Sequence, residues 1–363
     1  MKLSRLHAHH VQLGAQFSEI TGWSVPREYG DVTAEYYAVR QTVGLADLSH
    51  RGLIRVTGDD RIKWLQSIAS NDLLPLTPGQ GLYSSLLTHK GKMLTYFRVF
   101  LLPDAVLVED VGEIGQTTAQ TLKRFLLYGT KAKMEPLTEQ WGLLLLSGPR
   151  AVSVLQSALH VDLTQAAIPS VTPGLFKGQP IYLLRTEETG ECDIEIALPA
   201  DHLQALWDQI ATAGQAHGLR PIGTAALDML RIEAGLPKAG PDINEEIVPP
   251  EANLEGKAFS LSKGCYPGQE VVARMDTYGS VRRHLVGLTL SEPIIPPHGA
   301  KLFSEDREVG WVSSAAMSPQ VGTVIALGFP LRDFTKPDTA LRVEVDGRRI
   351  AATVHPLPWY RRA

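Results

Sequence analysis

The residue of this chain best suited to covalent or metal chemistry is Cys265, which stands in the segment 263–270, with the sequence KGCYPGQE. Pro267 and Gly268 are residue types that favour the second and third positions of a tight turn. Such a turn would present Cys265 and Tyr266 at an exposed tip. An exposed thiol could react or ligate a metal.

Two cations are expected close to this thiol. Lys263 precedes it by two residues, and Arg274 follows on a strand predicted from Val271 to Met275. Positive charge near a cysteine favours the thiolate, which is the form that binds metals and attacks electrophiles. The competing interpretation is structural, because an isolated cysteine is more often a small, buried, apolar residue.

Two side chains on predicted strands could contact a ligand. Glu195 lies in the strand predicted over 193–198, where alternation places it on the face opposite the isoleucines. A solvated strand face is the simplest explanation for that carboxylate. Tyr83 is, by the same reasoning, an ordinary strand aromatic that could also stack on a flat ligand.

Arg231 lies near the end of a helix predicted over 223–234. At helical spacing it could pair with Asp228 or Glu233 as a surface salt bridge. An arginine is also chemically suited to bind a carboxylate or a carbonyl edge.

Composition indicates a globular protein with two or three domains. The chain has 363 residues, of which 44% are hydrophobic and 20% charged. The net charge of −4 and the lack of a basic stretch argue against direct binding of nucleic acid. No apolar run approaches the roughly 20 residues that cross a bilayer, so no membrane association is expected.

The two cysteines, Cys192 and Cys265, are too few for a disulfide framework or a four-ligand metal site. We therefore expect no metal site made by this chain alone and a reducing, cytoplasmic location. The N-terminus does not read as a signal peptide, because histidines interrupt its apolar stretch.

Helices and strands are expected to alternate up to about residue 270, with short strands after it. Besides 223–234, helices are predicted over 31–44, 60–68, 115–127, 150–159 and 201–216. Strands are predicted over 53–56, 93–102, 182–185 and 194–198, and in the tail over 271–275, 284–290, 308–313, 323–327 and 341–345. This pattern predicts domains at 1–280 and 281–363, the second one all-β.

Five segments in order resemble the folate-binding family of YgfZ-type proteins, which are relatives of the glycine-cleavage T-protein. They are 22–30 (GWSVPREYG), 44–50 (GLADLSH), 79–83 (GQGLY), 231–237 (RIEAGLP) and 263–270 (KGCYPGQE). The resemblance implies an α+β, multi-lobed T-protein-like fold with a C-terminal antiparallel β-barrel around a folate cavity.

The same resemblance implies site residues. Cys265 would be the functional thiol, with Lys263, Tyr266, Gln269 and Glu270 in support. A pterin ring presents an amino group and a ring N–H side by side, and a carboxylate can accept both. The resemblance assigns that role to Glu195, and it places Arg231, Tyr83 and Thr95 around the same tetrahydrofolate.

One departure from the T-proteins concerns catalysis. Those enzymes carry an aspartate pair where this chain has Thr95 and Tyr96, and no Asp or Glu occurs between Asp72 and Asp104. A threonine cannot act as an acid or base near neutral pH. We therefore expect folate binding without the T-protein acid–base group, which leaves enzymatic activity undecided.

Three functions remain open. The leading hypothesis is a tetrahydrofolate-binding accessory protein that supports iron–sulfur cluster assembly or repair, and tRNA modification indirectly, with iron–sulfur client or scaffold proteins as partners. The alternative is a folate-dependent aminomethyl or one-carbon transferase of the T-protein type. A second alternative is a non-enzymatic interaction module.

Overall fold

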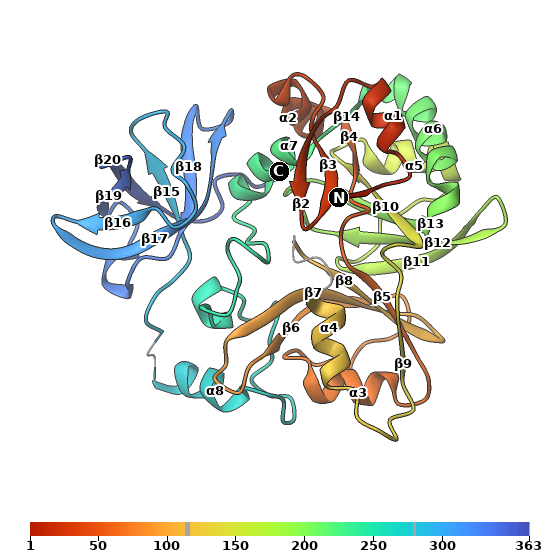
Figure 1. The fold of residues 1–363 in the computed structure, drawn as a ribbon, viewed down its shortest axis with the longest axis horizontal. Helices are drawn as coiled ribbons and strands as arrows, with labels where there is room; N and C mark the ends of the chain where they lie inside the picture. The colour runs from red at the N-terminus through yellow and green to blue at the C-terminus, as the bar shows by residue number, and fades with distance from the viewer. Residues whose placement is uncertain (113–116, 279–280, 363) are drawn as a thin grey trace.

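The structure, a computed structural model, describes residues 1–112, 117–278 and 281–362. Two β-sheets, a small N-terminal sheet and a closed β-barrel are arranged around a common centre (Figure 1). Within the described ranges, no helix is both long and apolar enough to span a membrane. The expected α+β class with a C-terminal antiparallel barrel is confirmed.

The first sheet has five antiparallel strands in the order β6-β7-β8-β5-β9. Its apolar side chains on one face pack against helices α3 and α4. Strand β7 has an aliphatic or aromatic residue at most positions, as a strand buried on both faces requires. The bounds are β5 (Leu53–Thr57), α3 (Arg61–Ile68), β6 (Gly81–Leu87), β7 (Met93–Leu101), β8 (Ala105–Asp110), α4 (Thr117–Arg124) and β9 (Lys133–Pro136).

The second sheet has six strands in the order β11-β12-β13-β10-β4-β14, and it packs face to face against the first sheet. Helices α5 and α6 cover its other face. The bounds are β4 (Val43–Asp47), β10 (Trp141–Ser147), α5 (Ala151–Leu159), β11 (Ser170–Phe176), β12 (Gln179–Thr186), β13 (Asp193–Pro199), η1 (Ala200–His202), α6 (Leu203–Gly214), η2 (Gln215–His217) and β14 (Leu219–Pro221).

The N-terminal residues form a three-stranded sheet in the order β1-β3-β2, beside two helices that contact each other, α2 and α7. The Asp31 side chain accepts a hydrogen bond from the Ala34 N–H and so caps α2. The bounds are β1 (Lys2–Leu3), α1 (His7–Gln12), β2 (Gln16–Ile20), β3 (Trp23–Glu28), α2 (Val32–Gln41) and α7 (Thr224–Glu233).

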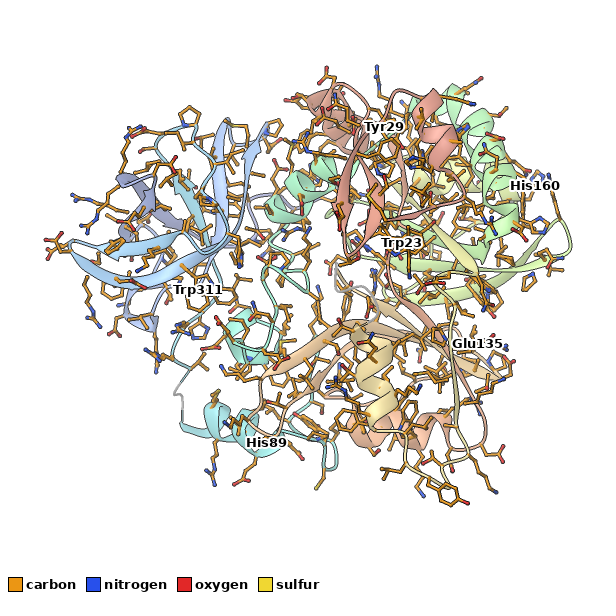
Figure 2. The ribbon with its side chains drawn as sticks, in the orientation of Figure 1. Trp23, Tyr29, His89, Glu135, His160 and Trp311 are labelled. Atoms are coloured by element: carbon orange, nitrogen blue, oxygen red, sulfur yellow. The ribbon has the colours of Figure 1, made fainter. Side chains whose placement is uncertain are left out.

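The C-terminal barrel closes in the order β15-β18-β17-β16-β19-β20 around an aliphatic core. A long segment with the short helices η3 and α8 leads into it, and α8 lies beside the β6–β7 turn marked by His89 (Figures 1 and 2). The bounds are η3 (Pro249–Ala252), α8 (Gln269–Tyr278), β15 (Val286–Leu290), β16 (Lys301–Ser304), β17 (Arg307–Ser318), β18 (Thr323–Gly328), η4 (Arg332–Phe334), β19 (Ala340–Val345) and β20 (Arg348–His355).

Most of the elements expected from periodicity are confirmed, but one is wrong. The strand predicted from Val271 to Met275 is part of helix α8. The two valines favour a strand, whereas the pair of Glu270 and Arg274, four residues apart, supports a helix. The helix predicted over 115–127 begins at Thr117 in the described part, because 115 and 116 lie outside the described residues.

Candidate functional site

Arg98 on β7 joins the two large sheets. Its Nε donates to Glu109 Oε2 at 2.6 Å, and its Nη2 donates to Glu195 Oε1 at 2.8 Å. Arg98 and Glu109 are opposite one another in the β7–β8 ladder, whereas Glu195 lies on β13 of the second sheet. All three side chains are fully buried.

Two more charged residues complete this group. Arg51 Nη2 donates to Glu188 Oε2 at 2.8 Å, and Glu188 Oε1 lies 2.8 Å from Arg98 Nη2. Arg51 Nη1 lies 3.8 Å from both Glu109 Oε1 and Glu195 Oε1. We call these five residues, Arg51, Arg98, Glu109, Glu188 and Glu195, the central cluster.

The central cluster has three carboxyl groups for two guanidinium groups. Burial raises the pKa of Glu109 well above its ordinary value, Glu195 adds to this effect, and Arg98 opposes it. Burial also raises the pKa of Glu195, against the opposing charge of Arg98. For Glu188 the attraction of Arg51 and Arg98 outweighs burial and lowers the pKa to about 2. A proton on Glu109 would therefore balance the charges of the cluster.

Several buried polar atoms of the cluster have no hydrogen-bond partner. Among the described residues these include Arg98 Nη1, Arg51 Nε and Nη1, Glu195 Oε2 and Glu109 Oε1. Buried polar atoms in folded proteins are nearly always paired, so these atoms retain hydrogen-bonding capacity that the protein itself does not use. The edge of a pterin ring, with adjacent N–H donors and a carbonyl acceptor, matches this mixed set.

Two tyrosines lie on the same face of the first sheet as Arg98. Tyr83 stacks on Tyr96 with ring centroids 5.7 Å apart, and Lys257 Nζ lies 4.7 Å from the Tyr83 centroid. Tyr83 is opposite Arg98 in the β6–β7 ladder. The predicted ligand residues Tyr83 and Glu195 are thus brought together through Arg98.

Thr95 lies on the other face of β7, because successive side chains of a strand alternate. It is 1% exposed, and its hydroxyl accepts a hydrogen bond from the Leu86 N–H at 3.2 Å. Of Thr95 and Tyr96, the tyrosine is therefore the one on the sheet face that also carries Tyr83.

Arg231 on α7 is largely buried and connects α7 to the barrel. Its Nε pairs with Asp228 Oδ1 at 2.7 Å, its Nη1 with Asp242 Oδ2 at 2.7 Å, and its Nη2 donates to Ser314 Oγ at 2.8 Å. The expected ion pair between Arg231 and Asp228 exists, but the arginine side chain is largely buried, so this is not a surface salt bridge. Glu233, the other expected partner, instead accepts hydrogen bonds from Tyr36 and Arg40. Arg231 lines a narrow cavity together with Arg51 and Glu188, so it lies near one side of the central cluster.

Lys263 anchors the segment 263–270 to the end of helix α3. Its Nζ donates to the carbonyl oxygens of Gln66 at 2.6 Å, Ala69 at 2.5 Å and Asn71 at 3.1 Å, where α3 ends. These are carbonyl groups that a helix terminus leaves unpaired, and a cation there also suits the helix dipole. Burial lowers the pKa of Lys263 to about 8.

The turn predicted at Pro267 and Gly268 has the expected geometry. The Gln269 N–H donates to the Tyr266 carbonyl at 3.2 Å, and Gly268 has a φ of 81°. Cys265 is exposed with a free thiol, but Tyr266 is 6% exposed and its hydroxyl donates to the Ser260 carbonyl. The expectation that both would be exposed is therefore wrong for Tyr266, because its ring packs into the hydrophobic core.

The remaining residues of this segment have contrasting positions. Gln269 Nε2 donates to the Lys263 carbonyl at 3.1 Å and closes the loop. Glu270 is exposed and pairs with Arg274, which lies on helix α8 instead of the expected strand. No group of three or more His, Cys, Asp and Glu side chains within the described residues is arranged to hold a metal ion.

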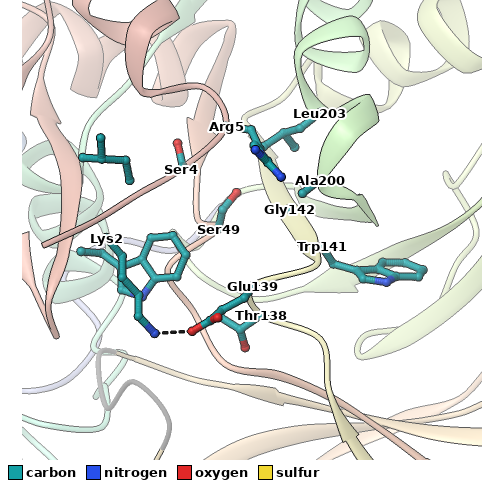
Figure 3. A pocket seen from close by; sticks show the side chains of 12 residues that line it. Lys2, Ser4, Arg5, Ser49, Thr138, Glu139, Trp141, Gly142, Ala200 and Leu203 are labelled. Atoms are coloured by element: carbon teal, nitrogen blue, oxygen red, sulfur yellow. Dashed lines mark hydrogen bonds and ion pairs between the residues drawn. The ribbon is translucent and has the colours of Figure 1, made fainter.

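A separate cavity of about 310 Å³ lies between the N-terminal residues and the second sheet (Figure 3). An ion pair between Lys2 and Glu139 lies at its edge. None of the site residues expected from the sequence lines this cavity.

Arg51, Arg98, Glu109 and Glu188 were missed in the sequence. One signal was available, because the apolar runs on either side of Pro103-Asp104 indicate a hairpin with a two-residue turn. That turn places Arg98 opposite Glu109. No comparable signal links either residue to Arg51 or Glu188.

Comparison with known proteins gives two family matches that together span most of the chain. The GCVT N-terminal domain model matches residues 6–261, and the glycine cleavage T-protein C-terminal barrel domain model matches residues 283–361. The aminomethyltransferase of Saccharopolyspora erythraea is 32% identical over 361 residues, covering 98% of this chain and 97% of the relative. That of a Geobacillus strain is 32% identical over 367 residues and covers both chains completely. The crystal structure of aminomethyltransferase T of the glycine cleavage system from Bartonella henselae superposes with a TM-score of 0.90 at 27% identity, covering 99% of this chain and 98% of that one.

Proposed function

Because this chain belongs to the glycine-cleavage T-protein family, we propose that it binds tetrahydrofolate and that the central cluster holds the pterin ring. The observation that carries the proposal is the pair of unpartnered atoms Glu195 Oε2 and Arg98 Nη1, buried beside the tyrosine stack. A ligand with donors and acceptors on one edge would satisfy both.

Each residue has a distinct task in this proposal. Glu195 accepts the amino group and the ring N–H of the pterin, while Arg98 or Arg51 donates to its carbonyl oxygen. Tyr83 provides an aromatic surface beside the ring. Arg231, which lines the same narrow cavity as Arg51 and Glu188, is suited to a carbonyl or carboxylate farther along the folate.

One-carbon transfer is the use of folate that the relatives support. The aminomethyltransferases named above align with this chain over nearly its full length. The aspartates absent at Thr95 and Tyr96 would then need a substitute. Glu109 is a candidate, since burial raises the pKa of its carboxyl group and Arg98 fixes its position.

A second candidate function rests on Cys265. Its thiol is exposed, on a loop that Lys263 and Gln269 hold in place, so a partner protein could reach it. The sequence resemblance to YgfZ-type proteins motivates a role with iron–sulfur client or scaffold proteins, and only indirectly in tRNA modification. In this function tetrahydrofolate would be a bound regulator or stabiliser.

Titration of tetrahydrofolate under anaerobic conditions tests the folate site. We expect saturable binding that Glu195→Gln weakens by about tenfold or more, which corresponds to about 1.4 kcal/mol. Glu135→Gln, on edge strand β9 away from the cluster (Figure 2), should leave binding unchanged. Absence of binding by the unaltered protein would reject both folate functions and leave a non-enzymatic interaction module.

Two further measurements separate the two candidate functions. Incubation with tetrahydrofolate and aminomethyl or methyl donors should yield a one-carbon folate if the protein is a transferase, and Glu109→Gln should abolish the yield. In cells under oxidative stress, Cys265→Ser should lower the activity of iron–sulfur enzymes if the thiol function is correct, whereas Glu270→Gln should not. Full activity in the Cys265→Ser cells would exclude that function.

A further inference from the structure

The segment between α4 and β9 carries two large side chains in contact with solvent. Leu127 is 72% exposed, and its neighbour Tyr128 is fully exposed. The two preceding residues, Phe125 and Leu126, instead pack against the core that lies under α3 and α4. Single exposed apolar residues are ordinary, whereas contiguous apolar surface is typical of interaction sites.

Both ends of this segment are fixed to helix α3 and the turn before it. At its start, the indole N–H of Trp64 on α3 donates to the Phe125 carbonyl at 3.0 Å. At its end, the Lys131 N–H donates to Asp60 Oδ2 at 2.8 Å, and the Asp60 N–H donates to the Lys131 carbonyl at 3.0 Å. The two exposed side chains are therefore presented from a segment with anchored ends.

A groove of about 580 Å³ lies between α3 and this segment. Helices α3 and α4 pack on the same face of the first sheet, and the groove follows the outer side of α3 (Figure 1). The apolar part of its lining comes from Trp64, Ile68, Phe125 and Leu127. A recess of this size can receive several side chains of another molecule.

Positive charge surrounds the groove. Four exposed cations lie in its lining or next to it in the chain: Lys63, Lys123, Arg124 and Lys131. Two acids, Asp59 and Asp60, stand against them, and the Asp60 carboxylate already accepts the hydrogen bond that anchors the segment. The whole chain has a net charge of −4, so this excess of cations is local. The groove is therefore suited to attract negative charge.

One end of the groove lies at the helix end that holds the segment 263–270. Ser67 and Ile68, in the last turn of α3, line the groove. The Gln66 carbonyl in the same turn accepts a hydrogen bond from Lys263 Nζ. A molecule in the groove would therefore contact the part of α3 against which the loop with the exposed thiol is anchored.

The chemistry of the groove distinguishes between possible occupants. A nucleic acid needs a continuous track of cations for its phosphates, whereas aromatic and aliphatic side chains separate the cations here. A flat membrane surface would meet Leu127 and Tyr128 but would not fill the groove. A protein segment that carries Asp or Glu beside a large apolar residue satisfies both the charge and the shape.

We propose that this groove docks an acidic segment of a partner protein. An aliphatic or aromatic side chain of that segment lies against Trp64 and Ile68. Its carboxylates pair with Lys63 and Arg124, at the border of the groove. The proposal rests on this groove alone and is independent of folate binding.

Selection of a phage-displayed library of random dodecapeptides against the full-length protein tests the proposal. We expect the enriched peptides to exceed the unselected library both in Asp and Glu and in Leu, Phe, Tyr and Trp. The strongest peptide, synthesised with a fluorescent label, should bind about tenfold or more weakly to Leu127→Ser and to Lys63→Glu. Its affinity for the unaltered protein should fall as the salt concentration rises. Fluorescence anisotropy measures each affinity.

Matched controls come from the β11–β12 hairpin, where Leu175 and Lys177 are also exposed. Leu175→Ser and Lys177→Glu should leave peptide binding unchanged. All four substitutions are at exposed positions, so thermal unfolding of the variants should match that of the unaltered protein and exclude misfolding as the cause of lost binding.

The proposal is overturned if no peptide is enriched, if the enriched peptides lack acidic residues, or if either groove variant binds the peptide as tightly as the unaltered protein. It is also overturned if the groove variants instead weaken binding to DNA or to phosphatidylglycerol vesicles, or dissociate a dimer in sedimentation. The groove would then serve a nucleic acid, a membrane or a second copy of this chain.

Discussion

Arg98 Nη2 lies 2.8 Å from Glu195 Oε1, and this contact joins the two large sheets at a fully buried point. The same guanidinium group holds Glu109 on the neighbouring strand. A buried arginine is costly to desolvate, and removing Arg98 would leave its carboxyl partners, Glu109, Glu188 and Glu195, without this counter-charge. Arg98 and Glu195 therefore contribute both to the stability of the fold and to the candidate site.

Arg98→Met should destabilise the protein by about 3 to 5 kcal/mol at pH 7, because it leaves buried carboxyl groups without a counter-charge. The loss should be smaller near pH 5, where those carboxyl groups take up protons. Urea unfolding at both pH values measures the difference. Arg55→Met, which breaks the partly exposed pair with Asp104, should cost no more than about 1 kcal/mol.

Glu188 should govern part of the acid sensitivity of the fold. Its pKa is lowered to about 2 by Arg51 and Arg98, compared with about 4.3 in an unfolded chain. Its contribution is therefore complete above about pH 4.3 and is lost as the pH falls through about 2. Glu188→Gln should cost roughly 2 to 3 kcal/mol at pH 7, and its unfolding curve should converge with that of the unaltered protein near pH 2. Equal pH dependence in both proteins would contradict this pairing.

Two glycines of the segment 263–270 should respond differently to alanine. Gly268 has a φ of 81°, and a Cβ atom there would lie 2.4 Å from the Thr88 carbonyl oxygen. Gly268→Ala should therefore lower the free energy of unfolding by about 1 to 3 kcal/mol or more. At Gly264 a Cβ atom would meet nothing within 4 Å, so Gly264→Ala should be nearly neutral. Thermal unfolding of the two variants provides the comparison.

Lys263 should hold the segment 263–270 against the end of α3. Lys263→Met removes the donor to three carbonyl oxygens, one of them in a buried hydrogen bond and two in part-buried ones, and we expect a loss of about 1 to 3 kcal/mol. Amide hydrogen exchange should quicken in the last turn of α3 and in the loop that carries Cys265. Glu270→Gln, which alters only an exposed pair with Arg274, is the control and should leave the exchange unchanged. Unchanged exchange in Lys263→Met would show that the loop is held by other contacts.

Local order in the sequence predicted much of the fold. The Asp31 cap, the apolar run of β7, the alternation in β13 and the turn at Pro267 depend on neighbouring residues alone, so they could be inferred without tertiary contacts. The segment 271–275 shows the limit of this reasoning. Its valines favour a strand, and only the packing of Val272 into the core beside Tyr266 shows that a helix satisfies this burial.

The sequence by itself determined the turn beside Cys265 and the absence of an acid at Thr95, because each can be seen in a few neighbouring residues. The pairing of Arg98 with Glu109 was missed, although it follows from the short hairpin turn at Pro103-Asp104. Only the tertiary structure decided that Arg51, Glu188 and Glu195 meet this pair. These contacts depend on how the two sheets pack against each other. The charged groups become buried only when that packing is complete. Carboxyl groups from three separate parts of the chain thus meet beside Arg98, and folding alone brings them together.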